Sequence, residues 1–392
     1  MICGEIKVRT VDLFCGCGGM SLGFQNAGFE IVGAFDLWNS AIECYNKNFT
    51  HSAMALDLSK KNTALKSIRP LEPTVIVGGP PCQDFSSAGE RTEGARANLT
   101  VSFAKIVKSI HPKYFVMENV SRAKMSQAYM EARKLFKEAG YGLTEQILDA
   151  SKCGVPQKRK RLFCIGALNE PDGFLDAYLS HNQSVLPMTV RQYFVSNCFQ
   201  LPGAFYYRHP RSYTRRAIYS IDEPSPTIRG VNRPKPPEYQ RHANDAANPE
   251  TVRSLTYRER ALIQTFPIDF QFGENQMEVE QMIGNAVPVN LAFHVANALS
   301  AFENKREHAT SMEFGDWLRI NYGYSSLAIK DTISRVGRSN KIVPLDPNNE
   351  QEYIKRLDDE TFSLSKNVRS QLKRAVKLYF EFLSVQNAGE NQ

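Results

Sequence analysis

The sequence predicts an α/β protein built on a doubly wound, mostly parallel sheet. Short apolar, β-branched runs alternate with helical stretches over the first 166 residues, and a glycine-rich turn follows the first run. Runs of about four to eight residues separated by helices are typical of parallel strands, whose crossover connections place helices on both faces of the sheet. At 392 residues, the chain is also long enough for about two or three domains.

Five apolar runs are predicted to be strands of this sheet. They are, in chain order, residues 7–14, 29–36, 73–78, 114–117 and 162–165. Helices are expected at residues 20–27, directly after the glycine turn, and at about 40–48, after the second strand. Because parallel strands end at the same edge of a sheet, the residues after these strands are expected to form the site.

The alternation of strands and helices stops at about residue 169. Beyond it prolines crowd residues 223–237, and aromatic and arginine side chains are interleaved. We therefore expect residues 169–250, called the middle segment below, to be a small irregular domain. Helical patterning returns at Thr256.

After the middle segment the core is expected to resume, and a charged, linker-like stretch at 303–310 is expected to lead to a helical extension. The predicted parts are an α/β core at 1–168 and 251–302, the middle segment at 169–250, and the extension at 311–392. The last helix of the extension carries five basic side chains beside apolar residues at helical spacing. These basic residues are Lys366, Arg369, Lys373, Arg374 and Lys377. An amphipathic packing helix with a solvated basic face is favoured over a contact with an anionic partner.

Composition excludes several classes of protein. Hydrophobic residues make up 42% and charged residues 23% of the chain, as in soluble globular proteins. No apolar run approaches the roughly 18 residues of a membrane span, and no export signal is visible, so a cytoplasmic protein without a membrane partner is expected. Eight cysteines without paired CxxC spacing predict neither a disulfide scaffold nor a metal site. The net charge of +7 suits an anionic partner without proving one.

The turn at residues 15–19 predicts a site for a nucleotide-like ligand. Its glycines let a ligand approach the backbone, and the following helix offers free amides. Asp36 ends the next strand, where a carboxylate can bind both hydroxyls of a ribose, and Asp57 could reach the edge of a base. A tight turn without a ligand explains the glycines about equally well. The GxGxxG fingerprint is not matched, which disfavours a dehydrogenase.

Cys82 follows Gly78-Gly79-Pro80-Pro81, where a strand ends and a loop begins. The prolines fix φ along this approach, so the thiol is expected to be held in place. By its position alone, Cys82 would more often be a structural cysteine than a nucleophile.

Six motifs in chain order resemble those of the DNA cytosine-5 methyltransferases. They are Phe14-Cys15-Gly16-Cys17-Gly18-Gly19, Pro81-Cys82-Gln83, Glu118-Asn119-Val120, Gln157-Lys158-Arg159-Lys160-Arg161, Arg258-Glu259-Arg260 with Gln264-Thr265-Phe266-Pro267, and Gly284-Asn285-Ala286-Val287-Pro288. Any one of these strings is short, but six in this order across residues 8–300 are very specific. The resemblance implies the Rossmann-like fold of class I methyltransferases.

The resemblance also implies S-adenosyl-L-methionine as the cofactor. The residues that it places at the cofactor are Phe14, Gly16, Gly18, Gly19, Asp36, Asp57, Pro80 and Asn285. It assigns Cys82 as the nucleophile that adds to cytosine C6 and Glu118 as the acid at N3, with a pKa raised by burial. Arg159 and Arg161 alternate with lysines and are expected on one face, Arg161 at the active site and Arg159 as its helper.

Double-stranded DNA is the partner that the resemblance implies. Because C5 and C6 lie inside the duplex, the base must be extruded, and the polar loop at 84–96 is expected to close over it. Residues 205–241 hold eight basic against three acidic residues, with interleaved tyrosines, in the place of the family's target-recognition domain. The residues expected to bind DNA are Ser86, Ser87, Arg96, Arg208, Arg211, Arg215, Arg216, Thr227, Arg229 and Arg233.

The sequence thus predicts a DNA (cytosine-5-)-methyltransferase that acts on a short specific site, as a monomer. It would either partner a restriction endonuclease of the same specificity or act alone. Two alternatives stay open. One is a transfer-RNA cytosine-5 methyltransferase, although Ser86 and Ser87 resemble the DNA branch more closely. The other is a catalytically silent DNA-binding relative, which the intact Cys82, Glu118 and Arg161 disfavour.

Overall fold

A computed structural model describes residues 8–81, 98–210, 212, 214–343, 350–358 and 364–389. The chain forms two compact units. The larger unit consists of residues 7–300, and the smaller unit consists mainly of residues 301–392. Among the described residues, no helix combines the length and apolar character that crossing a membrane requires.

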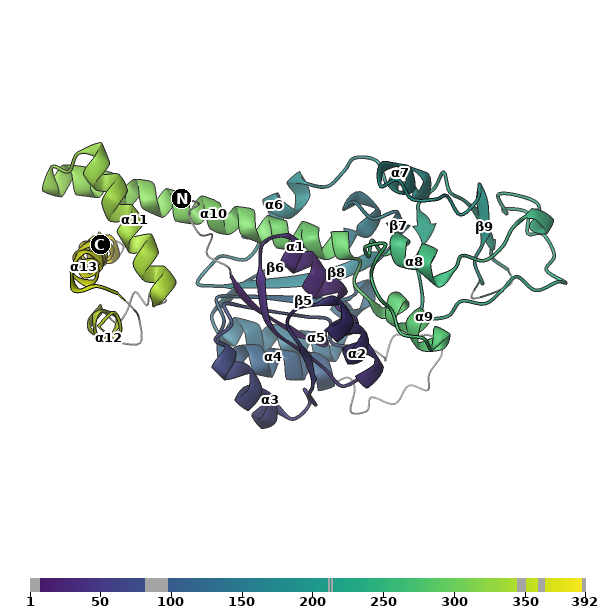
Figure 1. The fold of residues 1–392 in the computed structure, drawn as a ribbon, viewed down its shortest axis with the longest axis horizontal. Coiled ribbons are helices and arrows are strands. Elements are labelled where there is room, and N and C mark those ends of the chain that lie inside the picture. The colour runs from purple at the N-terminus through teal and green to yellow at the C-terminus, as the bar shows by residue number, and fades with distance from the viewer. Residues whose placement is uncertain are drawn as a thin grey trace. The chain divides into compact units, whose positions relative to one another are not determined.

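The larger unit is built on a seven-stranded sheet (Figure 1). Its strands, in their order across the sheet, are β3 (Ala53–Ala55), β2 (Glu30–Asp36), β1 (Arg9–Leu13), β4 (Val75–Gly78), β5 (Tyr114–Val120), β8 (Lys160–Leu168) and β6 (Tyr141–Asp149). Only β8 runs against its neighbours, β5 and β6, and the other pairs are parallel. The predicted fold class, an α/β protein with a mostly parallel sheet, is confirmed.

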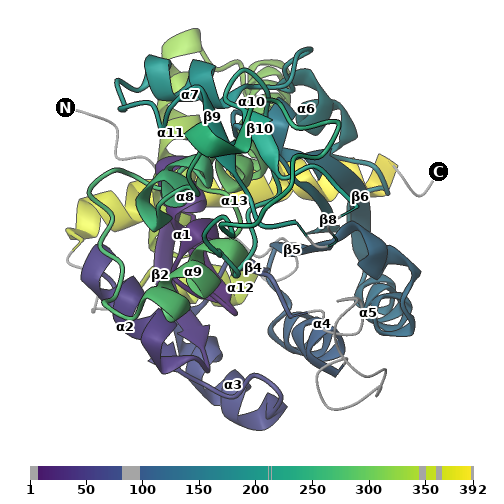
Figure 2. The same cartoon turned by 90° about the vertical axis from the view of Figure 1, so that its right-hand side faces the viewer.

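Helices cover both faces of the sheet, as expected. One face packs against α3 (Lys61–Ile68), α4 (Asn98–Ile110) and α5 (Gln127–Glu138) through a core that includes Val11, Phe103 and Phe115. The other face packs against α2 (Asn39–Asn48), with Ala34 and Tyr45 buried between them, and α1 (Gly19–Asn26) also contacts β2. Figure 2 shows α3, α4 and α5 as a separate layer.

The remaining elements are mostly short. In the larger unit they are β7 (Gln157–Lys158), α6 (Asp176–His181), α7 (Val190–Ser196), β9 (Phe205–Tyr207), β10 (Ile218–Ser220), β11 (Ser225–Pro226), α8 (Tyr257–Ile263), α9 (Gln276–Asn285) and single 3₁₀ turns at 69–71, 121–125, 150–152 and 249–251. Within the middle segment β9 pairs with β10. β11 also belongs to this segment, but its partner strand, β7, lies in the core. This second pairing ties the middle segment to the strand that precedes Arg161.

The smaller unit is helical, as the sequence predicts. It contains α11 (Ser326–Ile342), α12 (Glu350–Arg356) and α13 (Lys366–Gly389). Leu372 and Val376 are buried, and the apolar side of α13 packs on α11 and α12. The expectation of a linker at 303–310 is wrong, because these residues lie within α10 (Val289–Tyr322). Lysine, arginine and glutamate are good helix formers, so their charges did not indicate a break in the helix.

Candidate active site

The carboxyl ends of four neighbouring parallel strands meet at one edge of the sheet. In the register of the strands, Leu13 of β1 lies beside Gly78 of β4, and Gly78 lies beside Met117 of β5. The residues that follow, including Glu118, therefore share this edge. Because β8 is antiparallel to β5, its beginning reaches the same edge, and Arg161 pairs there with Val120.

The glycine turn after β1 is held by Asp36, which ends β2. Phe14, Gly16 and Gly18 all have positive φ, at 62°, 54° and 96°. The amide of Gly16 donates to Asp36 Oδ2 at 2.8 Å, and Oδ1 accepts from the amides of Leu37 and Trp38. Oδ2 keeps capacity for one more donor, such as a ribose hydroxyl. A Cβ at Gly16 would meet nothing within 4 Å, so the turn faces open space.

The start of α1 lies directly against the segment between α9 and α10. A Cβ at Gly19 would stand 2.3 Å from the carbonyl oxygen of Val287, so only glycine fits there. This contact brings the late motif around Asn285 to the glycine turn, as the sequence suggests. The Asn285 side chain is exposed and accepts from Gln281 at 2.9 Å.

Asp57 follows β3, next to β2 in the sheet. Its Oδ1 accepts from the amide and the hydroxyl of Ser59, and these hydrogen bonds lower the pKa of the Asp57 carboxyl. Asp57 is half-buried, so part of the carboxylate stays accessible.

A buried ion pair occupies the centre of the edge. Glu118 Oε1 lies 2.9 Å from Arg161 Nε, and both side chains are largely buried. Burial raises the pKa of Glu118, and the nearby charges of Arg161 and Arg159 oppose that rise. A carboxyl group in this setting can hold a proton and donate it to a ligand.

Glu118 and its neighbour contact the segment that leads to Cys82. A Cβ on Gly79 would lie 3.1 Å from Glu118 Oε2, and Asn119 Nδ2 donates to the carbonyl of Pro80 at 3.3 Å. The described chain reaches Pro81 at this point. Cys82 itself lies outside the described residues, as do Ser86, Ser87, Arg96 and Arg211.

Arg159 takes a different place from Arg161. It is 2% exposed, and its guanidinium donates to the carbonyl oxygens of Ile228, Gly284 and Ala286 at 2.9–3.1 Å. Lys158 and Lys160, which alternate with the two arginines, are exposed, so the predicted alternation along this stretch is present. The side chain of Arg159 thus binds backbone on two segments, the middle segment and the end of α9, instead of pointing to solvent.

The arginines of the middle segment fall into two groups. Arg208 and Arg229 donate to the carbonyls of Thr227 and His209, and Arg216 is paired with Glu223. Arg215 and Arg233 are exposed side chains.

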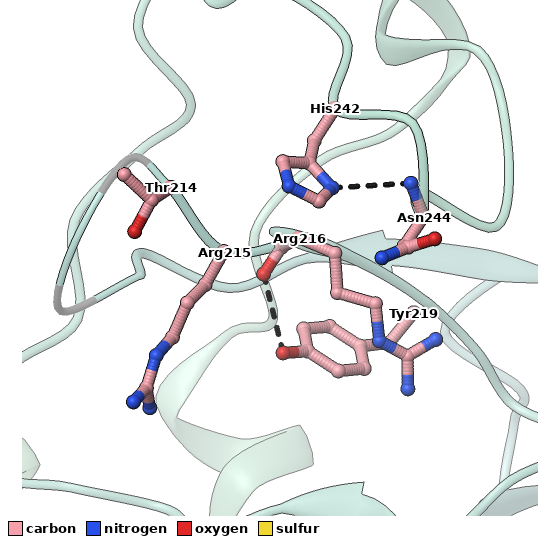
Figure 3. Close-up of a pocket in the computed structure, with 6 residues that line it drawn as sticks. All are labelled: Thr214, Arg215, Arg216, Tyr219, His242 and Asn244. Atoms are coloured by element: carbon pink, nitrogen blue, oxygen red, sulfur yellow. Dashed lines mark hydrogen bonds between the residues drawn. The ribbon is translucent and has the colours of Figure 1, made fainter.

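Figure 3 shows this division in a surface pocket lined by Thr214, Arg215, Arg216, Tyr219, His242 and Asn244. The Arg216 guanidinium lies over the Tyr219 ring, 4.3 Å from its centroid, while Arg215 extends away from it.

Three residues of this region were not among the predicted site residues. Leu37, beside Asp36, is 67% exposed although it is apolar, and so offers a hydrophobic surface next to the turn. Gln157 and Gln264 are buried and hydrogen-bonded to each other. The sequence contained both glutamines within matched motifs, but nothing in their spacing indicated that their side chains meet.

Asp12 is a further buried acid below the glycine turn. Its Oδ2 accepts from Ser21 Oγ at 2.6 Å, and Oδ1 has no hydrogen-bond partner within the described parts of the chain. Tyr45 donates to the same hydroxyl and also bonds to His51. Burial raises the pKa of Asp12 to about 7.

Comparison with known proteins covers nearly all of the larger unit. Residues 8–301 match the family model of the C-5 cytosine-specific DNA methylases. The chain is 53% identical over 299 residues to the type II methyltransferase M.HgiDI of Herpetosiphon aurantiacus, covering 76% of this chain and 96% of that protein. It is 54% identical over 301 residues to M.HindV of Haemophilus influenzae, covering 76% and 98%.

Solved structures agree in fold at lower identity. The S. pombe Dnmt2 methyltransferase is 20% identical with a TM-score of 0.56, and the match covers 75% of this chain and 99% of that chain. The Entamoeba histolytica methyltransferase EhMeth gives 18% identity and a TM-score of 0.52, with coverages of 75% and 98%.

The cofactor of this methylase family is S-adenosylmethionine, and the turn fits it. A free acceptor position on Asp36 and the open space at Gly16 suit a ribose and the chain attached to it. Family model, close relatives and fold all point the same way. The chain belongs to the C-5 cytosine-specific DNA methylases and is a DNA (cytosine-5-)-methyltransferase of the type II restriction–modification kind.

Proposed function

We propose that the enzyme methylates C5 of a flipped-out cytosine in a short, specific double-stranded DNA sequence, through a covalent bond from Cys82 Sγ to C6. The buried Glu118–Arg161 pair carries this proposal, because Glu118 lies against Gly79 and its neighbour Asn119 bonds to Pro80, in the segment that leads to Cys82. S-adenosylmethionine supplies an electrophilic methyl group when bound.

The chain's own residues would act on the ring in a defined order. The Cys82 thiolate adds to C6, and the displaced electron pair moves toward N3 and O2. Glu118 gives its proton to N3, for which its raised pKa suits it, and Arg161 stabilises charge at O2. C5 then takes the methyl group, and S-adenosylhomocysteine is left. Removal of the C5 proton by a base, water included, and return of the N3 proton to Glu118 let Cys82 leave as the thiolate and restore the aromatic ring.

The proposed cofactor contacts follow the strand edge. Asp36 would bind the ribose hydroxyls, and the backbone of Phe14, Gly16 and Gly18 would lie along the remainder of the ligand. Leu37 adds an apolar surface for the flat base, and Asp57 would bind its polar edge. Gly19 acts by allowing the approach of Val287, and Pro80 and Asn285 stay proposed contacts.

The proposed DNA contacts are strongest at the exposed arginines. Arg215 and Arg233 have the freedom to meet phosphates or guanine edges. Arg208, Arg216 and Arg229 would act mainly by shaping the surface, because each binds groups within the segment. Ser86, Ser87, Arg96, Arg211 and Thr227 stay proposed contacts. A restriction endonuclease of matching specificity is the proposed partner in the host, and a cytoplasmic monomer is the proposed form.

Covalent trapping tests the proposal. Wild-type enzyme, incubated with S-adenosylmethionine and duplex DNA containing 5-fluorocytosine, should give a complex that survives denaturation. Cys82→Ser should give none and should show no turnover, while it still binds S-adenosylhomocysteine. Cys198→Ser, at an exposed cysteine, is the matched control and should behave as wild type.

Trapping by Cys82→Ser at the wild-type level would refute the assignment of the nucleophile. Transfer-RNA in place of DNA should give no methylation, and a strong RNA signal would favour the RNA alternative.

A further inference from the structure

The Thr227–Ile228 dipeptide of the middle segment is hydrogen-bonded mainly to residues 157–159, which lead to Arg161. Thr227 Oγ1 donates to the carbonyl of Lys158 at 2.8 Å, and the Thr227 carbonyl accepts from Arg208. The amide of Ile228 donates to Gln157 Oε1 at 2.8 Å, and its carbonyl accepts from Arg159 at 2.9 Å. The pairing of β11 with β7 runs directly into these contacts.

Gln157 connects the Thr227–Ile228 dipeptide to Gln264. Because Gln157 Oε1 accepts from Ile228, its Nε2 is the donor, and it donates to Gln264 Oε1 at 2.7 Å. Gln264 Nε2 then donates to the carbonyls of Ile283 and Ala286, at 2.5 and 3.1 Å. Both glutamines are completely buried, so each bond is made away from water.

The carbonyl of Ala286 connects these hydrogen bonds to the glycine turn, where the cofactor is proposed to bind. It accepts from Arg159 at 3.1 Å as well as from Gln264. The next residue, Val287, carries the oxygen against which Gly19 packs. The contacts among Thr227, Ile228, Gln157, Gln264, Arg159 and Ala286, called the amide joint below, thus connect the middle segment, the Arg161 strand and the glycine turn.

We propose that Gln264 is a positioning residue for methyl transfer and for sequence discrimination. This rests on the proposed function, in which the middle segment recognises DNA and Arg161 contacts the flipped base. Through the amide joint, Gln264 fixes Thr227–Ile228 relative to Arg161, so that correct seating of the DNA coincides with correct placement of the cytosine.

The chemistry of the joint supports a positioning role. Hydrogen bonds between buried groups have narrow distance and angle ranges, so a directed series of them fixes the relative position of segments. Apolar side chains would fill the same space without fixing that direction. Small misplacements of reacting groups are costly, because a shift of about 1 Å can lower a rate by about 100-fold.

The test uses the full-length enzyme and a duplex that carries its site, found by bisulfite sequencing of a treated random DNA pool. Gln264→Met keeps the length of the side chain and removes its three hydrogen bonds. We expect kcat to fall by about 10- to 100-fold and the preference for the site over duplexes with one changed base pair to fall in parallel. The KM for DNA and the Kd for S-adenosylhomocysteine should change much less.

Two further variants complete the design. Thr227→Val removes only the bond to Lys158 at the half-exposed end of the joint, so it tests the proposal even where Gln264→Met does not fold. It should lower kcat and discrimination in the same direction by a smaller factor. Gln271→Met, at an exposed glutamine of the larger unit, is the matched control and should leave both unchanged.

A merely structural role would give a different pattern. If folded Gln264→Met and Thr227→Val lose thermal stability but keep wild-type kcat and discrimination, the proposal is overturned. This outcome differs from a failure of the proposed function, which would show as trapping or turnover by Cys82→Ser.

Discussion

Two buried carboxyl groups of the larger unit face different surroundings. Glu118 has the Arg161 guanidinium at 2.9 Å, so its negative charge has a partner whenever it ionises. Asp12 accepts a hydrogen bond from the Ser21 hydroxyl. The charge that acts on it is that of another acid, Asp36, and this repulsion raises the pKa of Asp12 further. The protonated form of Asp12 is therefore the stable one in the folded enzyme below about pH 7.

Asp12→Asn should make the enzyme more stable at alkaline pH. With a pKa of about 7 when folded and 3.8 when unfolded, wild-type Asp12 keeps its proton only in the folded state between these values. The stability this provides is complete below about pH 4 and is lost as the pH rises through 7. One pKa unit corresponds to about 1.4 kcal/mol, so the free energies of unfolding should differ by a few kcal/mol at pH 8 and converge at low pH.

Urea unfolding of both proteins across this pH range measures the difference. The side chains near Asp12 that can also titrate, namely Cys15, Asp36, Tyr45 and His51, are present in both proteins. Asp172→Asn is the control of opposite sign, because Lys137 lowers the pKa of Asp172. Its loss of stability should appear at neutral pH and vanish in acid. A wild-type advantage over Asp12→Asn at pH 8 would contradict the prediction.

At the scale of elements, the strands were easier to predict than their directions. The runs that became β1, β2, β4 and β5 are apolar and β-branched, and this pattern is local. The position of β8 between β5 and β6, antiparallel to both, depends on pairing between distant segments. Two strands of this sheet were not among those predicted. β3 has only three residues, and in β6 the polar residues Thr144, Glu145 and Gln146 interrupt the apolar ones.

The same distinction explains which side chains of the candidate site could be predicted. Glu118 and Arg161 were found because they stand in short motifs that resemble those of the DNA cytosine-5 methyltransferases. The contacts of Arg159, Gln157 and Gln264 are made to backbone and amide groups far away in the chain, which no local spacing reveals. Likewise, nothing in the sequence separated paired arginines such as Arg216 from exposed ones such as Arg215.

Arg215→Gln and Arg216→Gln should therefore have different effects. Arg215 is exposed, so its loss should weaken DNA binding and lower the salt slope by about 0.9 if it neutralises one phosphate, with no change in melting midpoint. Arg216 makes two hydrogen bonds to Glu223, at 3.0 and 2.5 Å, so its loss should lower the melting midpoint. Salt-dependent titrations and thermal melts measure both. An unchanged affinity and slope for Arg215→Gln would argue against its contact with DNA.

At the scale of the whole chain, the family match accounts for residues 8–301, and the helical extension lies beyond it. The matched relatives are covered over 96% and 98% of their own length by about three quarters of this chain. In the extension, the apolar side of α13 is used for packing within the smaller unit. This favours the structural interpretation of its basic residues.

A triple change on α13, Lys366→Gln with Arg374→Gln and Lys377→Gln, should leave DNA binding unaltered. All three side chains are exposed, so the helix should keep its fold. The slope of log affinity against log salt concentration would fall by about 0.9 for each lost phosphate contact. The loss of three contacts would therefore be readily measured in a DNA titration at several salt concentrations. A reduced slope with intact folding would show that the extension binds DNA.

The pairing of β11 with β7 has a consequence for engineering new specificities. The middle segment leaves the sheet after β8 at the edge opposite the catalytic residues, and it docks beside them again through hydrogen bonds that include those to residues 157–159. A segment transplanted from another methylase would therefore be joined to the core through its two ends but would lack the hydrogen bonds that hold residues 225–228 against residues 157–159. Chimaeras that carry over Ser225 to Ile228 unchanged should be the ones that stay active.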